Sequence, residues 1–383
     1  MVSGWLAAPI APIHTLRAQF HFVVILVDDN ARATRQSGAR KEKQARRMAS
    51  LKVALLTSSR SAAAAIAVVQ TEGGAVAAPA APRSRGYGWT IFAGLLASIA
   101  TLAVLMHMAG LRIDPLSRGA VPYYAAAALV LALGRWAPRL MPRHGRALAD
   151  CAEFFGLFTV ISLLGATASY PIAALTGGMH DAALQRIDEA LGFDWLAWDR
   201  LVADHRALQW LGLAAYRTIY LTPAILLGWY AWKGDKAAAH RFLMTFWLAA
   251  ALTLALYPLM TAVGPLSYLW HGPLPYLPES EEWQAALIPA LRAHYVDLAQ
   301  LRGLVSAPSF HTVAAVLYIR AAWPHRELRA PLVAVNAAML LSTPVEGTHY
   351  LIDMILGAVV AVVAIVAVRW LMAVKAGPRL AAA

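Results

Sequence analysis

Beyond residue 88 the chain alternates long apolar runs with short polar loops. Eight of the runs are candidate membrane spans, because a helix needs about 20 mostly apolar residues to cross a bilayer. Their approximate limits are 88–110, 120–136, 150–175, 208–232, 241–262, 308–323, 330–344 and 348–374. The pattern predicts an all-α fold, a polytopic transmembrane helical bundle with about eight spans.

The loops between these runs alternate in charge. Every second loop is rich in arginine and lysine; these are 135–146, 233–241, 325–329 and the tail after residue 369. Basic loops stay on the cytoplasmic side of a membrane. Eight spans with both ends in the cytoplasm satisfy that rule throughout. We therefore expect a multi-pass protein of the cell membrane, such as a bacterial inner membrane.

Four segments follow from this pattern. Residues 1–86 form a basic, alanine-rich segment that we expect to be disordered, because it has too little apolar surface to bury; an alternative is that translation starts at Met48. Residues 87–175 hold the N-terminal transmembrane helices. Residues 176–374 form a second membrane domain, and 375–383 a cytoplasmic tail.

The two long loops on the opposite side have other compositions. Residues 176–206 place acidic residues, among them Asp181, Asp188, Glu189, Asp194 and Asp199, between aromatic and apolar ones, which predicts an amphipathic helix lying in the outer interface. Residues 263–307 are rich in proline, tryptophan and tyrosine, and become helical in pattern around Trp283 to Leu301. We expect this second loop to cap the outer face.

Composition excludes several classes of protein. A hydrophobic content of 60% with 14% charged residues is not that of a soluble protein. The net charge of +12 suggests nucleic-acid binding, but residues 1–88 hold twelve Lys/Arg and four Asp/Glu, so 12 − 4 = +8 of it lies there. No nucleic-acid partner is expected. The single cysteine, Cys151, excludes an internal disulfide and a cysteine-based zinc site.

Two short polar stretches interrupt the apolar sequence near the end of the chain. In the second, 347–353, His349 and Asp353 are four residues apart, so on a helix their side chains can touch. In the first, 306–311, Pro308 suits the first turn of a helix.

That helix start would leave the N–H groups of Ser309, Phe310 and His311 facing an anion. The eight-span topology brings both stretches to the outer side at one membrane depth. Two histidines, a carboxylate and an anion site together suggest phosphoryl transfer.

Other interpretations of these residues stay open. Each histidine alone could be a packing residue in the core. His311, His349 and Asp353 could ligate zinc, but no fourth ligand is evident, so we expect neither a metal nor a cofactor. A transporter or a non-catalytic membrane scaffold is a further alternative. Transporters usually contain an internal repeat, and the sequence has no evident one.

Two motifs resemble those of the type 2 phosphatidic acid phosphatase superfamily. Residues 308–311, Pro-Ser-Phe-His, match its Pro-Ser-x-His motif. Ser342, His349 and Asp353 match its Ser-Arg-x5-His-x3-Asp motif, with Thr343 in place of the arginine. The superfamily's first motif, Lys-x6-Arg-Pro, is not found in a suitable place.

The sequence of residues 342–353, together with Leu-Gly-Phe-Asp-Trp at 191–195, is most similar to that of the inositol phosphorylceramide synthase branch. The resemblance covers roughly 170–374, implies a six-helix catalytic core in the bundle, and makes 176–374 a phosphatase- or phosphotransferase-like catalytic membrane domain. It implies a lipid phosphotransferase, inositolphosphotransferase-like, or a plain lipid phosphatase. The partners would be membrane lipids carrying phosphoester headgroups.

The resemblance also implies a role for each site residue. His349 would attack phosphorus and become a phosphohistidine, and Asp353 would hold its ring. His311 would protonate the leaving alkoxide and later activate the acceptor. Ser309 would bind phosphate oxygens.

The cations that such a site needs are not given by a motif. Arg217 lies about nine residues below the outer surface, or ~13 Å at helical rise, where an arginine is costly unless it faces a polar interior. It is a candidate phosphate ligand or a member of a structural ion pair. Arg302, six residues before Pro308, is the second candidate. Glu346 could bind a sugar hydroxyl or pair with an arginine.

Overall fold

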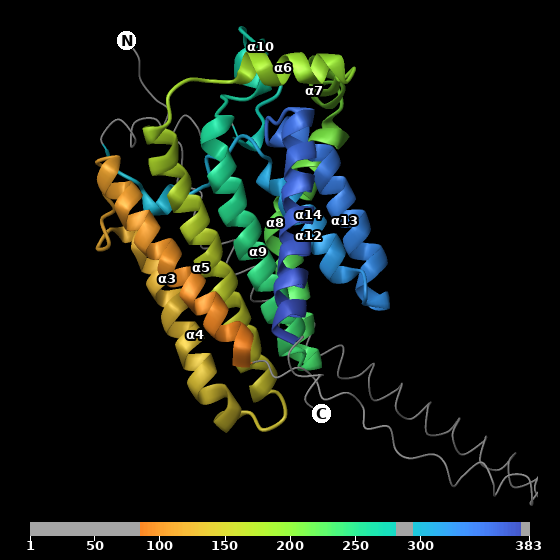
Figure 1. Cartoon of the computed structure of the whole chain (residues 1–383). Coiled ribbons are helices and arrows are strands. Elements are labelled where there is room, and N and C mark those ends of the chain that lie inside the picture. Colours follow the sequence, from red (N-terminus) through yellow and green to blue (C-terminus); the bar gives the residue numbers. More distant parts are fainter. Residues whose placement is uncertain (1–84, 281–293, 377–383) are drawn as a thin grey trace, which may run out of the picture. The chain divides into compact units, whose positions relative to one another are not determined.

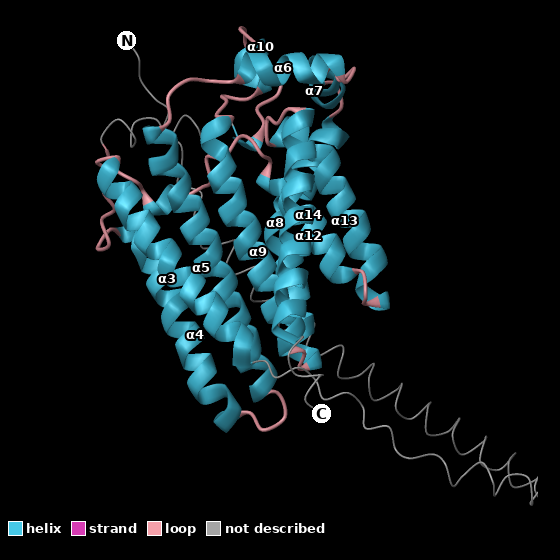
Figure 2. Cartoon of the chain, viewed as in Figure 1, coloured by secondary structure: helices cyan, strands magenta, loops and turns pink. Residues whose placement is uncertain are grey.

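The computed structural model describes residues 85–280 and 294–376, and all that follows concerns these residues. They form eleven α-helices, joined by loops and three single 3-10 turns, with no strand in the described part (Figure 2). An isolated bridge between Arg112 and Tyr295 is the one β-type pairing recorded there. The prediction of an all-helical bundle is confirmed. Residues 1–84 and 377–383, where disorder and a tail were expected, lie outside the described residues.

Each of the eight predicted spans is a helix. They are α3 (Arg85–Met108), α4 (Val121–Leu140), α5 (Gly145–Leu175), α8 (Arg206–Lys233), α9 (Lys236–Leu256), α12 (Phe310–Ala322), α13 (Arg326–Glu346) and α14 (Leu351–Ala376). Seven of the described helices are long and apolar enough to cross a membrane, so the chain is a multi-pass membrane protein. The exception, α12, has 13 residues and is about 20 Å long. It begins inside the bundle, after an extended segment.

Six helices, α5, α8, α9, α12, α13 and α14, pack on one another, and α3 and α4 pack on α5 (Figure 1). Large aromatic and aliphatic side chains fill the space between them. Phe246 and Tyr318 stack with ring centroids 6.4 Å apart, and Leu227 and Leu243 are fully buried beside them. Between transmembrane helices such packing stabilises the arrangement through van der Waals contact rather than through removal of apolar surface from water.

Two of these helices approach closely at Gly357 of α14. A β-carbon at this position would lie 2.4 Å from the carbonyl oxygen of Ser309, where α12 begins. Only glycine allows that separation. The start of α12 is therefore held directly against the first turns of α14.

Short helices lie across one end of the bundle (Figure 1). They are α6 (Asp181–Ala190), α7 (Trp195–Ala203) and α10 (Pro265–Leu269). The prediction of a single helix over 176–206 is wrong. The chain turns at Gly192, whose φ is +75°, so there are two helices.

Three acidic residues of these helices face the protein rather than the solvent, whereas Glu189 of α6 is exposed. Asp181, Asp188 and Asp199 are each no more than 3% exposed. A buried carboxylate needs hydrogen-bond donors, and Asp181 and Asp188 receive them from backbone N–H groups of other segments.

The helix predicted around Trp283 to Leu301 falls partly on residues 281–293, which lie outside the described residues. The described remainder is a 3-10 turn, η3 (Leu298–Gln300), followed by extended chain. The N–H of Leu304 donates to Ser169 Oγ at the end of α5, at 2.9 Å. The N–H of Ala262 donates to Ser306 Oγ at 3.1 Å. These bonds hold the segment extended on its way into the bundle.

The basic loops lie together at the other end of the bundle. Lys236 Nζ at the start of α9 is 2.6 Å from Asp150 Oδ1 near the start of α5. The Trp229 indole at the end of α8 donates to His325, between α12 and α13, at 3.3 Å. Three loops that are distant in sequence therefore share one end, as the alternation of charge predicts.

Candidate active site

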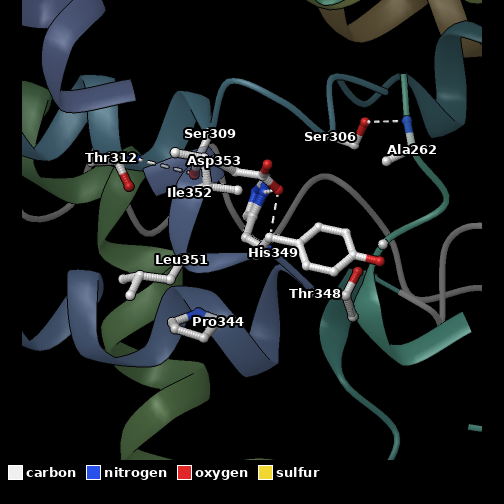
Figure 3. Close-up of polar contacts among 12 residues, drawn as sticks. Ala262, Ser306, Ser309, Thr312, Pro344, Thr348, His349, Leu351, Ile352 and Asp353 are labelled. Atoms are coloured by element: carbon white, nitrogen blue, oxygen red, sulfur yellow. Dashed lines mark hydrogen bonds and ion pairs between the residues drawn. The ribbon is translucent and has the colours of Figure 1, made fainter. Parts of the chain in front are cut away.

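His349 and Asp353 lie where α13 passes into α14. His349 precedes α14 by two residues, and Asp353 is in its first turn. His349 Nδ1 is 3.6 Å from Asp353 Oδ2, and both side chains are almost fully buried (Figure 3). Asp353 Oδ2 also accepts the N–H of Tyr350 at 3.1 Å, as the last residue of a capping box does. The carboxylate therefore fixes the helix start and faces the imidazole at once.

The turn that carries His349 is tight. Thr348 has a φ of +46°, and the N–H of His349 bonds back to the carbonyl of Pro344 at 3.1 Å. A β-carbon on Gly347 would lie 2.7 Å from Cδ2 of the His349 ring and 2.9 Å from the hydroxyl of Tyr216. Glycine is required here because any side chain would displace the imidazole. With Nδ1 toward Asp353, the second ring nitrogen, Nε2, is the one directed away from the carboxylate.

Two aspartates of α6 hold this turn in place. The N–H groups of Leu351 and Ile352 donate to Asp188 at 2.7 and 2.9 Å. The hydroxyl of Tyr350 donates to Asp181 at 3.0 Å. Burial raises the pKa of Asp188, although the two backbone hydrogen bonds act in the opposite direction. Thus the first N–H groups of α14 are satisfied by side chains, and the short helix α6 sets the position of His349.

The second polar stretch meets the first directly. The backbone N–H of Ser309 donates to the carbonyl oxygen of Asp353 at 2.9 Å. Ser309 is the N-cap of α12, and its Oγ accepts from the N–H of Thr312 at 3.5 Å. Two expectations are corrected. Pro308 precedes the cap instead of opening the helix, and the N–H of Ser309 is used within the protein. Of the three N–H groups expected to face an anion, those of Phe310 and His311 remain candidates.

His311 lies in the first turn of α12 and packs on α8. Its ring stacks on Tyr216, with centroids 3.9 Å apart and planes 15° from parallel. It lies within electrostatic range of His349 and Arg302. The four predicted residues His349, Asp353, His311 and Ser309 are thus gathered in one place, from two helix starts.

Several buried polar atoms of this place have no hydrogen-bond partner among the described residues. They are Nδ1 of His349, Oδ1 of Asp353 and Oγ1 of Thr312. Buried polar groups are nearly always paired, so each exception needs an explanation. Nδ1 of His349 faces Asp353 Oδ2 at 3.6 Å, so the other two atoms are the ones left without a facing polar partner in the described part of the chain.

The two candidate arginines share one carboxylate. Arg217 Nε is 3.0 Å from Glu279 Oε2, and Arg302 Nη1 is 3.0 Å from Glu279 Oε1. The Glu279 side chain is 3% exposed, whereas those of Arg217 and Arg302 are 53% and 30% exposed. The acid is therefore buried between two cations that retain an open face. Arg302 lies within electrostatic range of His311.

Glu346 is buried between the arginine pair and the histidine turn. Its carboxylate accepts the Tyr276 hydroxyl at 2.6 Å and the N–H of Glu279 at 3.3 Å. Burial, and then the bond to Glu346, raise the pKa of Tyr276. Glu346 was expected to bind a sugar hydroxyl or to pair with an arginine; its hydrogen-bond partners in the described part of the chain are instead the Tyr276 hydroxyl and the Glu279 N–H. It thereby holds the loop that carries Glu279.

Residues 182–367 match the PAP2 superfamily. The matched segment runs from α6 to α14 and includes both histidines, Asp353 and both arginines. The match supports the type 2 phosphatidic acid phosphatase superfamily and, with it, a phosphatase-type membrane enzyme with lipid substrates. The narrower branch of the inositol phosphorylceramide synthases is not shown by it. No curated protein and no solved structure matches the chain.

Within the PAP2-superfamily segment, sequence reasoning missed Glu279, Thr312 and the two aspartates of α6. The aspartates had a signal: Asp181, Leu184 and Asp188 recur at helical spacing on one face, so the acids share the apolar face. All three are buried. Glu279 had no comparable signal, since it lies in an irregular loop. For the zinc alternative, the described part of the chain contains no group of three or more His, Cys, Asp or Glu that could hold a metal ion.

Proposed function

We propose that the protein is an integral membrane lipid phosphotransferase that acts through a phosphohistidine on His349. The observation that carries this proposal is the meeting of two helix starts. The buried His349–Asp353 pair lies beside the N-cap of α12 and the ring of His311. The superfamily match supports the coarser statement, a phosphatase-type enzyme. A plain lipid phosphate phosphatase, which transfers the group to water, is the second candidate.

In the first step Nε2 of His349 attacks the phosphorus of the lipid phosphoester. The new N–P bond forms while the P–O bond to the leaving alkoxide breaks, and His311 gives that oxygen its proton. Asp353 holds the imidazole with Nδ1 toward it and stabilises the charged ring. The 3.6 Å separation is longer than a hydrogen bond, as is common for catalytic pairs without substrate.

In the second step an acceptor hydroxyl gives its proton to His311 and attacks the phosphorus. The N–P bond breaks and His349 is restored. Charge on the phosphoryl oxygens is stabilised by the N–H groups of Phe310 and His311, by Ser309 and by the two arginines. Arg302, which lies near His311, is the principal cation in this proposal, and Arg217 the second.

The acceptor that we propose is a polyol or lipid hydroxyl, as in an inositolphosphotransferase. This choice of acceptor rests on the sequence of residues 342–353, which resembles that of the inositol phosphorylceramide synthase branch. The test incubates the purified full chain with a phospholipid labelled at phosphorus, with and without inositol or ceramide. Transfer gives a labelled inositol or ceramide phosphodiester. A labelled product that is independent of either acceptor, and that carries oxygen from ¹⁸O-water, establishes the phosphatase instead.

The same preparation tests the intermediate. Phosphohistidine is acid-labile, so the protein is quenched at alkaline pH and its label mapped. We expect label on His349 in the wild type and none in His349→Ala. His311→Ala should lose turnover of natural lipids, yet still form phosphoenzyme from p-nitrophenyl phosphate, whose leaving group needs no proton. Label on His311 would exchange the two roles, and wild-type turnover in His349→Ala would rule out the mechanism.

We further propose that the site faces the outer, periplasmic side of a bacterial inner membrane, since the basic loops lie at the other end. Met179 and Arg143 are exposed at opposite ends of α5. In a Cys151→Ser background, Met179→Cys should react with an impermeant thiol reagent added to intact cells. Arg143→Cys should react only after lysis. The opposite labelling pattern would reverse the orientation and leave the chemistry unchanged.

A further inference from the structure

A groove lies at the end of the bundle opposite the histidines. It runs between α4 and α5, encloses about 850 Å³ and is open on one side. Its wall includes Val130 and Leu131, and Gly134 contributes no side chain to it. A β-carbon on Gly134 would meet no atom within 4 Å, so the absence of a side chain is what keeps this part of the groove open.

The polar end of the groove carries surplus positive charge. Arg135, Arg146 and Lys236 line it, together with Asp150 and Glu153. Lys236 is occupied by the two acids, at 2.6 Å from Asp150 and 3.4 Å from Glu153. Neither arginine makes an ion pair within the described part of the chain. The unbalanced charge at this end therefore belongs to the two guanidinium groups.

The groove also has the polarity of a membrane boundary. α4 is one of the helices that could span the membrane, and Arg135 lies five residues before its last residue, or about 7.5 Å from the helix end. Val130 and Leu131 lie further toward the middle of the helix. An occupant must thus present negative charge at the level of the basic loops and hydrocarbon below it.

We propose that this groove binds an anionic phospholipid of the leaflet opposite the active site. The phosphate would lie between Arg135 and Arg146, since guanidinium groups bind phosphate oxygens in pairs. An acyl chain would lie on Val130 and Leu131 and over Gly134. Basic pockets between transmembrane helices on the cytoplasmic side bind anionic headgroups for the same reason. The site is independent of the proposed phosphotransferase reaction.

Native mass spectrometry of the purified full chain in detergent tests this site. The probes are phosphatidylglycerol and, as the neutral comparison, phosphatidylcholine. We expect one phosphatidylglycerol to be retained in preference, and Arg135→Gln/Arg146→Gln to weaken its binding about tenfold or more. The matched control, Arg320→Gln/Arg326→Gln, removes two exposed arginines at the same end that do not line the groove. It should bind within about twofold of wild type.

A second variant keeps the charge and fills the space. Gly134→Leu places a side chain in the groove, in a helix where leucine is favoured over glycine, and should also weaken retention of phosphatidylglycerol. Equal retention of phosphatidylcholine, an equal loss in the control, or normal binding by Gly134→Leu would each overturn the proposal. Melting temperatures without lipid, equal across the set, exclude misfolding as the cause of a loss.

Discussion

At the end of the bundle that carries His349, the two aspartates of α6, Asp181 and Asp188, are buried and bound to backbone N–H groups. Asp188 is fully buried and accepts from the first turn of α14. At the other end, carboxylates are paired with side-chain cations near the surface. Glu153, 41% exposed, bonds to His240 at 2.8 Å and to Lys236 at 3.4 Å. Each end thus contains a histidine–carboxylate pair, but in different surroundings.

The difference shows two uses of charge in one membrane protein. A buried carboxylate is costly unless donors surround it, and backbone donors come only at fixed positions and directions. Such contacts therefore fix geometry. Exposed pairs between long side chains contribute little to stability, but their cations determine which side of the membrane a loop occupies. At the end with the histidines, charged groups fix the positions of side chains and helix starts. At the end with the basic loops, they determine the orientation of the protein in the membrane.

The largest expected contrast is between the two histidine–carboxylate pairs. Asp353→Asn should keep the fold and lower turnover about 10²–10⁴-fold, because the imidazole loses the charge that stabilises its cationic form. Glu153→Gln, the matched change at the other end, should alter turnover by no more than about twofold. Steady-state assays with the lipid donor measure both. Equal losses would mean that the chemistry does not depend on this site.

Removal of each of the two arginines bound to Glu279 should lower kcat/KM by a different amount. Arg302→Gln should lower kcat/KM about 10²-fold, the usual effect of losing one donor to a phosphoryl or acyl oxyanion. Arg217→Gln should lower it about tenfold, since its side chain is more exposed than that of Arg302. Arg326→Gln at the basic end serves as the control. A larger loss for Arg217 than for Arg302 would reverse their order at the phosphate.

The cap on α14 is tested by two changes at one position. Asp188→Ala leaves two buried N–H groups unpaired and should lower the free energy of unfolding by about 2 kcal/mol. Asp188→Asn retains one acceptor oxygen and should recover most of that loss. Unfolding in detergent and turnover are measured together. A variant that is destabilised but has wild-type kcat would show that α6 supports the fold and does not position His349.

The same position predicts a dependence on pH. The pKa of Asp188 is raised by burial, so the folded state holds this proton at pH values where the unfolded state has lost it. Its contribution to stability is then fully present below the ordinary aspartate pKa and is lost as pH rises through the raised value. The pH profile of unfolding should be flatter in that window for Asp188→Asn than for wild type. An unchanged profile would contradict this.

The smallest effect is expected at the basic end. Lys236→Gln removes the pairs with Asp150 and Glu153, and Lys236 is 42% exposed. The stability should change by less than about 1 kcal/mol, as for other exposed pairs, and turnover should not change. Thermal unfolding in detergent measures it. A loss as large as that of Asp188→Ala would remove the distinction between the two ends.

Local pattern was enough to predict much of this protein. Each of the eight apolar runs is a helix in the structure, and the shared location of 306–311 and 347–353 followed from counting spans. His349, Asp353, His311 and Ser309 were predicted from spacing and motif to lie together, and the structure places them together. These features depend on residues within one helix or one turn of each other, or on the membrane thickness, which is the same for every span.

Only the tertiary structure decided the contacts that complete the site. Asp188 and Leu351 are 163 residues apart, Arg217 and Glu279 are 62 apart, and no periodicity links them. The use of the Ser309 N–H by the Asp353 carbonyl depends likewise on the close packing of α12 against Gly357. Hydrogen bonds of this kind are set by how helices lie against each other. The sequence of one segment does not carry that information, because the partner is chosen by distance and direction after the helices have packed.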